Sequence, residues 1–446
     1  MRIVIAGAGE VGSHLAKMLS NENHDIIVVD SDENQLRNIG STLDVMTFAG
    51  SATSFKTLKD LNIKLADLFI AVTHSEEINI VAAILGKKLG ASKVIARVDK
   101  IEYLDPENLK EFNQMGVDYM IYPESFAAKE IIGLVHQTAT NDIVTFSGGK
   151  LSMYVFKLSE DAPIINKSLF DTTKKLDSFE FRAVAITRNG ETIIPRGPEK
   201  FQANDMVYVI SNEKGIKKLV KYSGKKEFDI KNIMILGGSR IGKNAAKQLG
   251  TDHNIKLIEI NREKSYQLSN FLSNTLVING DGRNLNLLME EGIQNMDAFI
   301  AVTGNSETNI LSCMVAKKMG VKKTIAEIEN IDYIPIAESV GIDAIINKKL
   351  ITASRIFRFT MSEAVSSITC LTGTDAEVME FIAQPESKVT QGLLKDIGLP
   401  HDTIIGGVIR NEETIIARGN TQIKPYDKVV VFALPSAITT IGKFFN

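Results

Sequence analysis

Short apolar runs alternate with helical patterns through the first 120 or so residues of the chain. The apolar runs cover residues 2–7, 25–30, 68–73 and 94–98. Between the first two runs, Val11, Leu15 and Met18 recur on one face at helical spacing. The alternation of buried strands with amphipathic helices predicts βαβ units and a parallel sheet.

Further helices are expected around this region. One follows the strand at residues 68–73, and Thr73 with Glu76 is expected to form a capping box at its start. Residues 125–137 carry apolar side chains at helical spacing and are expected to form an exit helix available for packing on a neighbouring subunit. The matching helix of the second half is expected at residues 350–365.

A different pattern follows the first exit helix. Apolar runs at residues 151–158, 181–188, 191–195 and 205–210 are separated by turn signals such as Asn189–Gly190. Short strands joined by tight turns predict a small β-rich domain with a few short helices.

The chain then repeats itself. The segment AVTHSEEINI at Ala71 returns as AVTGNSETNI at Ala301, an offset of 230 residues. The segment RNGETIIPRG at Arg188 returns as RNEETIIARG at Arg410, an offset of 222 residues. A period of this length indicates duplication of whole domains and not a solenoid.

The expected fold class is α/β, with a duplicated Rossmann-like parallel-sheet domain and a small β-rich α+β lobe after each copy. The predicted segments are a Rossmann-like N-lobe at 1–124, an exit helix at 125–140, a C-lobe at 141–226, a second N-lobe at 228–348, a second exit helix at 349–366 and a second C-lobe at 367–446. Linkers are expected near Thr140, Lys225 and Ser366.

Composition narrows the class of protein. The 446 residues are 44% hydrophobic and carry a net charge of −3, so no basic excess points to nucleic acid as a partner. Cys313 and Cys370 lie outside any CxxC or Cys/His cluster, so neither a disulfide framework nor a zinc site is indicated. No apolar stretch reaches the roughly 20 residues of a spanning helix. We expect a cytoplasmic protein that reaches a membrane only through a partner.

A glycine-rich loop follows the first strand and opens the first helix. The loop comprises Gly7, Ala8, Gly9, Glu10, Val11 and Gly12 and fits GxGxxG. In this pattern Gly7 makes the tight turn, Gly9 leaves room for a pyrophosphate, and Gly12 allows close packing of helix and strand. Asp30 ends the second strand, where a carboxylate can bind ribose hydroxyls. Its acidity favours NAD(H) over NADP(H) and leaves ATP and ADP open as ligands.

Other candidate contacts lie at the carboxyl ends of later strands, where open α/β sheets bind ligands. Thr73 and His74 follow one strand, and Arg97 lies at the end of another, where it could reach a phosphate. The alternative for Arg97 is an ordinary solvated strand residue. His74 is replaced by Gly304 in the repeat, which favours a backbone contact at this position over imidazole chemistry.

The second copy has a changed loop. It comprises Gly237, Gly238, Ser239, Arg240, Ile241 and Gly242, so serine replaces the middle glycine. Glu259 keeps a carboxylate at a strand end, whereas Glu327 replaces Arg97 and reverses the charge. The two sites should therefore differ in ligand or affinity, and whether the second is occupied stays open.

On these motifs the chain resembles the TrkA family, the regulatory subunits of Trk-type potassium uptake systems, which carry tandem RCK domains. The resemblance implies binding of NAD(H), with ATP or ADP as competitors, and a homo-oligomeric ring, expected to be a tetramer, under a membrane potassium channel or transporter subunit. The family pattern implies nucleotide contacts at Gly7 to Val11, Asp30, Thr73, His74 and Arg97, and at Gly237 to Ile241 and Glu259. The chain departs from the pattern at Ser51, where the family usually has Asp, and at Ser239.

The competing hypothesis is an NAD-dependent oxidoreductase. Hydride transfer requires a substrate cavity beside the nicotinamide and normally a general acid or base. The six His are scattered and form no recognisable catalytic pattern with Lys or Tyr. The sequence therefore favours a regulator without catalytic or metal-binding residues, peripheral on the inner face of the membrane.

Overall fold

The computed structural model describes residues 1–20, 24–136, 138, 140–169, 171–172, 181–212, 215, 220, 223, 228–360, 365–371, 374 and 376–445. The chain divides into two units. The first comprises Met1–Phe126 with Lys348–Glu363, and the second comprises Ala127–Asn347 with Ala364–Asn446. Within the described residues, no helix combines the length and hydrophobicity needed to cross a bilayer.

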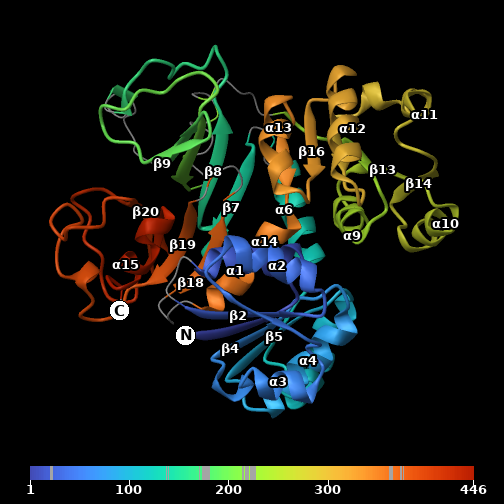
Figure 1. Ribbon diagram of the computed structural model, residues 1–446. Helices are drawn as coiled ribbons and strands as arrows, with labels where there is room; N and C mark the ends of the chain where they lie inside the picture. Colours follow the sequence, from blue (N-terminus) through green and yellow to red (C-terminus); the bar gives the residue numbers. More distant parts are fainter. Residues whose placement is uncertain are drawn as a thin grey trace. The chain divides into compact units, whose positions relative to one another are not determined.

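The first unit contains a parallel sheet with the strand order β3-β2-β1-β4-β5-β6. Its strands are β1 (Arg2–Ala6), β2 (Asp25–Asp30), β3 (Met46–Ala49), β4 (Leu68–Ala71), β5 (Lys93–Arg97) and β6 (Tyr119–Ile121). The helices are α1 (Glu10–Ser20), α2 (Glu33–Thr42), α3 (Phe55–Asp60), α4 (Glu76–Lys88) and α5 (Pro106–Gln114), with short turns η1 (Ile63–Leu65) and η2 (Ile101–Leu104). Figure 1 shows α1 and α2 on one face of the sheet and α3 and α4 on the other. This is the predicted Rossmann-like arrangement.

Burial explains why these segments pair. Residues Ile3 to Ala6 of β1 are fully buried, as expected for a central strand covered on both faces. Leu15 and Leu19 of α1 are fully buried as well, and so is Phe69 of β4. The apolar periodicity of the sequence therefore corresponds to the faces that form the core.

Helix α14 (Lys348–Phe357) belongs to the first unit although it follows the second Rossmann-like copy in the chain. It packs against α1, and Figure 1 shows the two helices adjacent. The helix ends earlier than the sequence predicts: η6 (Arg358–Thr360) follows it, and Ser366 lies in strand β18 and not in a linker. The predicted linker near Lys225 lies outside the described residues.

The second unit contains a parallel sheet with the equivalent order β14-β13-β12-β15-β16-β17. Its strands are β12 (Asn232–Leu236), β13 (Asn254–Glu259), β14 (Thr275–Asn279), β15 (Ala298–Ala301), β16 (Lys323–Glu327) and β17 (Ala344–Ile346). Its helices are α9 (Arg240–Leu249), α10 (Arg262–Phe271), α11 (Leu285–Glu290), α12 (Ser306–Lys318) and α13 (Ile334–Ser339), with η4 (Ile293–Asn295) and η5 (Ile331–Tyr333). The equal strand orders confirm the predicted duplication of the Rossmann-like domain.

The same unit holds two antiparallel sheets with the orders β10-β9-β11-β8-β7 and β18-β19-β22-β20-β21. The first is built from β7 (Asp142–Phe146), β8 (Leu151–Lys157), β9 (Phe181–Arg188), β10 (Glu191–Ile193) and β11 (Met206–Ser211). The second is built from β18 (Val365–Cys370), β19 (Glu377–Ile382), β20 (Thr403–Arg410), β21 (Glu413–Ile416) and β22 (Lys428–Ala433). The long helix α6 (Pro123–His136) leads into the first sheet. Short helical segments accompany the two sheets, namely η3 (Ser147–Gly149), η7 (Lys388–Thr390), η8 (Pro435–Ala437) and α15 (Ile438–Gly442). Tyr208 and Phe432 share one hydrophobic core, so the two sheets pack together.

Candidate nucleotide-binding sites

The glycine loop of the first unit lies where the strand order reverses. Strands β2 and β4 lie on opposite sides of β1, so the loops after β1 and β4 diverge. Gly7 follows β1 and Thr73 follows β4 closely. Ligands of open α/β sheets bind in the crevice at such a switch point.

Two glycines of the loop are required by the packing of the chain itself. Gly7 has a φ of +115°, and a Cβ there would lie 2.9 Å from the backbone of Val72 and Thr73. A Cβ on Gly12 would lie 1.8 Å from the carbonyl oxygen of Gly7. Both positions therefore exclude a side chain whether or not a ligand binds.

Gly9 differs from both. The nearest atom to a Cβ at this position would be Oε1 of Gln35, at 3.9 Å, and φ lies outside the left-handed region. The carbonyl of Gly9 accepts a hydrogen bond from the Ser13 amide at 2.8 Å, so Gly9 is the N-cap residue of α1. The described residues therefore leave room for a side chain at this helix N-terminus, where anions are favoured.

Asp30 lies directly beside the loop. Its Oδ2 accepts a hydrogen bond from the Ala8 amide at 2.6 Å, and its Oδ1 accepts one from the Asp32 amide at 2.9 Å. The carboxylate is only partly buried. The structure thus brings the loop and the acidic strand end together.

Asn79 organises the loop after β4 and is not among the residues predicted from the sequence. Its side chain is 1% exposed; Oδ1 accepts hydrogen bonds from the amide and the hydroxyl of Thr73 at 2.7 and 2.8 Å. Its Nδ2 donates to the carbonyl of Arg97 at 3.0 Å, which ties the ends of β4 and β5 together. Asn309 makes the equivalent bonds in the second copy, so the shared Asn of the two repeated segments was the available signal.

The predicted capping box at the start of α4 is wrong. Ser75 is the N-cap, and its hydroxyl accepts a hydrogen bond from the Ile78 amide at 3.2 Å. Thr73 is engaged by Asn79, and Glu76 accepts a hydrogen bond from the Asp99 amide at 2.8 Å. Thr73 therefore remains part of the loop that faces the crevice.

The remaining predicted contacts of the first copy differ in environment. The Arg97 side chain is 19% exposed, and its Nη2 lies 3.4 Å from Oδ1 of Asp99. Among the described residues its buried Nε has no hydrogen-bond partner, which leaves one donor for an anion. His74 is exposed and Val11 is buried in the core. Glu10 has an exposed carboxylate that forms an ion pair with Lys349, a residue the sequence analysis also missed.

The second loop uses the equivalent space for its own side chain. Ser239 is the N-cap of α9, and its hydroxyl accepts a hydrogen bond from the Gly242 amide at 3.2 Å. This bond occupies one of the amides that would otherwise face an anion. Arg240 and Ile241 begin the helix, and Ile241 is buried.

The acid of the second copy is more enclosed. Glu259 is 5% exposed; Oε2 accepts a hydrogen bond from the Gly238 amide at 3.0 Å and lies 3.2 Å from Nζ of Lys264. Asp281, at the position of Ser51, is held by Arg283 at 2.8 Å, and this hydrogen bond lowers the pKa of Asp281. The carboxylates of the second site are thus engaged by cations of the chain itself.

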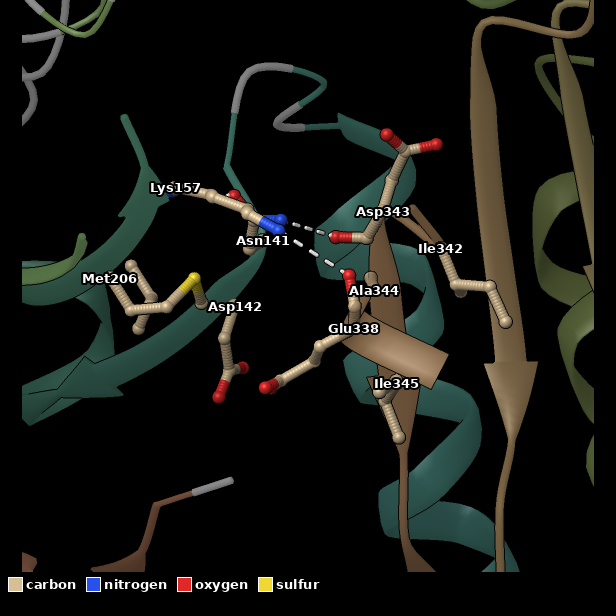
Figure 2. A pocket seen from close by; sticks show the side chains of 10 residues that line it. Asn141, Asp142, Lys157, Met206, Glu338, Ile342, Asp343, Ala344 and Ile345 are labelled. Atoms are coloured by element: carbon tan, nitrogen blue, oxygen red, sulfur yellow. Dashed lines mark hydrogen bonds between the residues drawn. The ribbon is translucent and has the colours of Figure 1, made fainter. Parts of the chain in front are cut away.

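A small cavity lies elsewhere in the second unit (Figure 2). Its volume is about 30 Å³, and it is lined by Asn141, Asp142, Val155, Lys157, Met206, Glu338, Ile342, Asp343, Ala344 and Ile345. Figure 2 shows the carboxyl ends of Asp142 and Glu338 turned toward one another. Burial raises the pKa of Asp142 to about 6 and also raises the pKa of Glu338. Among the described residues, no group of three or more His, Cys, Asp or Glu could hold a metal ion.

Comparisons with known proteins place this architecture in a family. The TrkA-N domain model matches residues 3–123 and 233–348, and the TrkA-C domain model matches residues 153–224 and 378–446. The Trk system potassium uptake protein TrkA homolog 2 of Methanosarcina mazei is 34% identical over 455 residues, covering 100% of both chains. The GsuK RCK domain is similar in structure, with 16% identity, a TM-score of 0.61 and coverage of 100% of this chain and 94% of that chain. The GsuK channel bound to NAD is similar with 16% identity, a TM-score of 0.60 and coverage of 100% of this chain and 78% of that chain.

The structural likeness shows a tandem RCK fold and confirms the predicted fold class. The sequence matches extend over most of the chain and show the family that the glycine loop and the repeated AVT segments indicate. The chain belongs to the TrkA family of Trk system potassium uptake proteins.

Proposed function

We propose that the chain is a cytoplasmic regulatory subunit that binds a nucleotide in its first Rossmann-like copy and thereby gates a membrane potassium transporter of the Trk type. NAD(H) is the favoured ligand, with ATP and ADP as competitors. The protein acts as a homo-oligomeric ring, expected to be a tetramer, and is peripheral to the inner face of the membrane. It catalyses no reaction.

The observation that carries this proposal is the open space in front of Gly9. Gly7 and Gly12 are explained by backbone contacts of the chain, whereas no contact with a described residue requires a glycine at position 9. A pyrophosphate that approaches the N-terminus of α1 does require it, because a side chain would lie between the phosphate and the helix amides. The NAD-bound state of the GsuK channel supports a dinucleotide at this fold.

The polar groups around the glycine loop of the first copy can each bind one part of a nucleotide. The amides at the start of α1 would donate to phosphate oxygens, and Asp30 would accept hydrogen bonds from ribose hydroxyls. Arg97 has a buried Nε donor without a partner among the described residues and would bind a further anionic group. Thr73 and His74 would contribute loop contacts, held in place by Asn79.

The second copy would bind nucleotide more weakly. Ser239 fills the equivalent space and bonds to the Gly242 amide, and Glu259 is paired with Lys264. Gly237, Gly238, Arg240 and Ile241 would still present backbone to a ligand, so we propose an asymmetric pair of sites in each chain.

Gating requires that the ligand bind one conformation more tightly than another. The test is Asp30→Asn, which keeps one acceptor oxygen for the Ala8 amide, removes the negative charge and gives up the hydrogen bond from the Asp32 amide. NADH affinity is expected to fall by about tenfold, equal to about 1.4 kcal/mol. Potassium uptake by cells that contain the transporter partner should lose its response to NADH in this variant.

Glu33→Gln is the matched control, since Glu33 is an exposed acid that forms an ion pair with Arg37 on the surface of α2. It should leave binding and uptake unchanged. A variant Asp30→Asn that no longer binds nucleotide but regulates uptake normally would refute gating. Steady turnover of NADH with a small carbonyl substrate would instead favour the oxidoreductase hypothesis.

A further inference from the structure

A lysine from the second half of the chain lies at the glycine loop of the first half. Lys349 is the second residue of α14, and its Nζ forms an ion pair with Oε2 of Glu10, the first residue of α1. The Lys349 side chain is 7% exposed, whereas the Glu10 side chain is 68% exposed. The ammonium is therefore enclosed, and the carboxylate that neutralises it faces solvent.

The position of Lys349 is set by packing of the whole helix. Helix α14 packs along α1. Phe359, just after α14, lies against Tyr119 with ring centroids 4.2 Å apart, and Arg355 lies 4.6 Å from the ring centre of Phe126. Lys349 is thus presented by a helix anchored at several points and not by a mobile surface segment.

An enclosed ammonium at this place favours a strong anionic partner. The N-terminus of α1 carries the positive end of the helix dipole, which disfavours a neighbouring cation and attracts phosphate. Burial lowers the pKa of Lys349 to about 8, which reflects the cost of the charged form. Glu10 supplies one carboxylate, and a phosphate chain at the same helix turn would supply more negative charge.

The repeat contains the same two positions with the charges exchanged. Arg240 stands at the position of Glu10. Ile121 and Ile346 occupy equivalent places in β6 and β17, and counting three residues on from each places Glu124 at the position of Lys349. In each copy, therefore, the first residue of the helix after the glycine loop and this position of the exit helix carry opposite charges, with the signs exchanged between the copies.

We propose that Lys349 binds the phosphate chain of the nucleotide in the first site, exchanging its pairing with Glu10 for a phosphate oxygen. This rests on the proposed function of the first site. It makes that site depend on α14, the element that leads from the second Rossmann-like copy to the second β-rich lobe. It also makes affinity rise with the number of phosphates on an adenine nucleotide.

The test compares AMP, ADP and ATP by calorimetric titration of the full chain. In Lys349→Met, ATP affinity is expected to fall about 10- to 100-fold, the range of one charge-assisted hydrogen bond, and AMP affinity by less than about twofold. Lys349→Arg keeps the charge and should stay within about threefold of the wild type for ATP. Lys17→Met is the matched control, because Lys17 is an exposed lysine in the last turn of the same α1, and it should change nothing.

A second variant keeps the inference testable if Lys349→Met does not fold. Glu10→Gln removes the competing carboxylate and should tighten ATP binding by more than it tightens AMP binding. Equal loss of AMP and ATP affinity in Lys349→Met, or unchanged ATP affinity in both variants, would overturn the role of Lys349 while leaving nucleotide binding intact. Absence of any nucleotide binding by the wild-type chain would overturn the proposed function as well.

Discussion

Replacement of Gly9 by alanine should weaken ligand binding while leaving the fold intact. Apart from its two neighbours in the chain, the nearest described atom to a Cβ at this position would be Oε1 of Gln35 at 3.9 Å, and φ lies outside the left-handed region. At the same time the added methyl group would project into the space in front of the α1 N-terminus, where the phosphates are proposed to bind. The folded chain should accept the substitution, and the nucleotide should not.

The magnitudes follow from the position of Gly9 as N-cap of α1. Alanine is a poorer N-cap than glycine by a few tenths to about 1 kcal/mol, and it lowers the entropy of the unfolded chain by about 0.4–1 kcal/mol, so stability should change by less than about 1 kcal/mol. If the methyl group displaces the pyrophosphate from two loop amides, the loss is about 3–6 kcal/mol, or at least roughly 100-fold in affinity.

The assay is NADH titration followed by nucleotide fluorescence, with thermal unfolding measured on the same samples without ligand. Gly12→Ala serves as the contrasting variant, because its Cβ would lie 1.8 Å from the Gly7 carbonyl oxygen and should destabilise the fold. Wild-type NADH affinity in a folded Gly9→Ala chain would show that the phosphates do not bind in front of Gly9. Loss of folding in Gly9→Ala would refute the claim that the chain leaves this space free.

Two further predictions concern other parts of the chain. Ser239→Gly removes the side-chain cap of α9 at a cost of a few tenths of a kcal/mol and should raise the nucleotide affinity of the second copy. NADH titration in a Gly9→Ala background measures the second copy alone. An unchanged affinity would contradict the proposal that Ser239 weakens nucleotide binding there. Asp142→Asn tests the buried carboxyl group of the small cavity. Because burial raises the pKa of Asp142 to about 6, its stabilising contribution is complete below the unfolded pKa near 4 and is lost as pH rises through 6. The variant should therefore exceed the wild type in unfolding free energy at pH 7.5, and in denaturant titrations the difference should shrink as pH falls and disappear below the unfolded pKa.

Much of the fold follows from local patterns. The apolar runs and helical faces predict the parallel strands, and the constant offset between Ala71 and Ala301 predicts a second copy with the same strand order. The sequence also predicts that the glycine loop lies beside Asp30. A strand, a tight turn and a helix bring the end of the second strand next to the end of the first. The hydrogen bond from the Ala8 amide to Asp30 shows that arrangement.

Other features depend on contacts that no local pattern contains. Lys349 meets Glu10 only because α14 packs on α1, and the two residues are far apart in the chain. The cap of α4 was misassigned because Thr73 and Ser75 are both good capping residues, and the choice is made by Asn79, which engages Thr73. Strand β7 (Asp142–Phe146) was not predicted, although Ile143, Val144 and Thr145 are all residues that favour strands.

The most direct test is a structure of the full chain determined after addition of NADH. We expect density for a dinucleotide in the first copy, with its pyrophosphate at the amides after Gly9 and its adenosine ribose at Asp30. Density for the dinucleotide at any other place, or an empty cleft at a concentration of NADH that saturates binding in solution, would contradict this expectation.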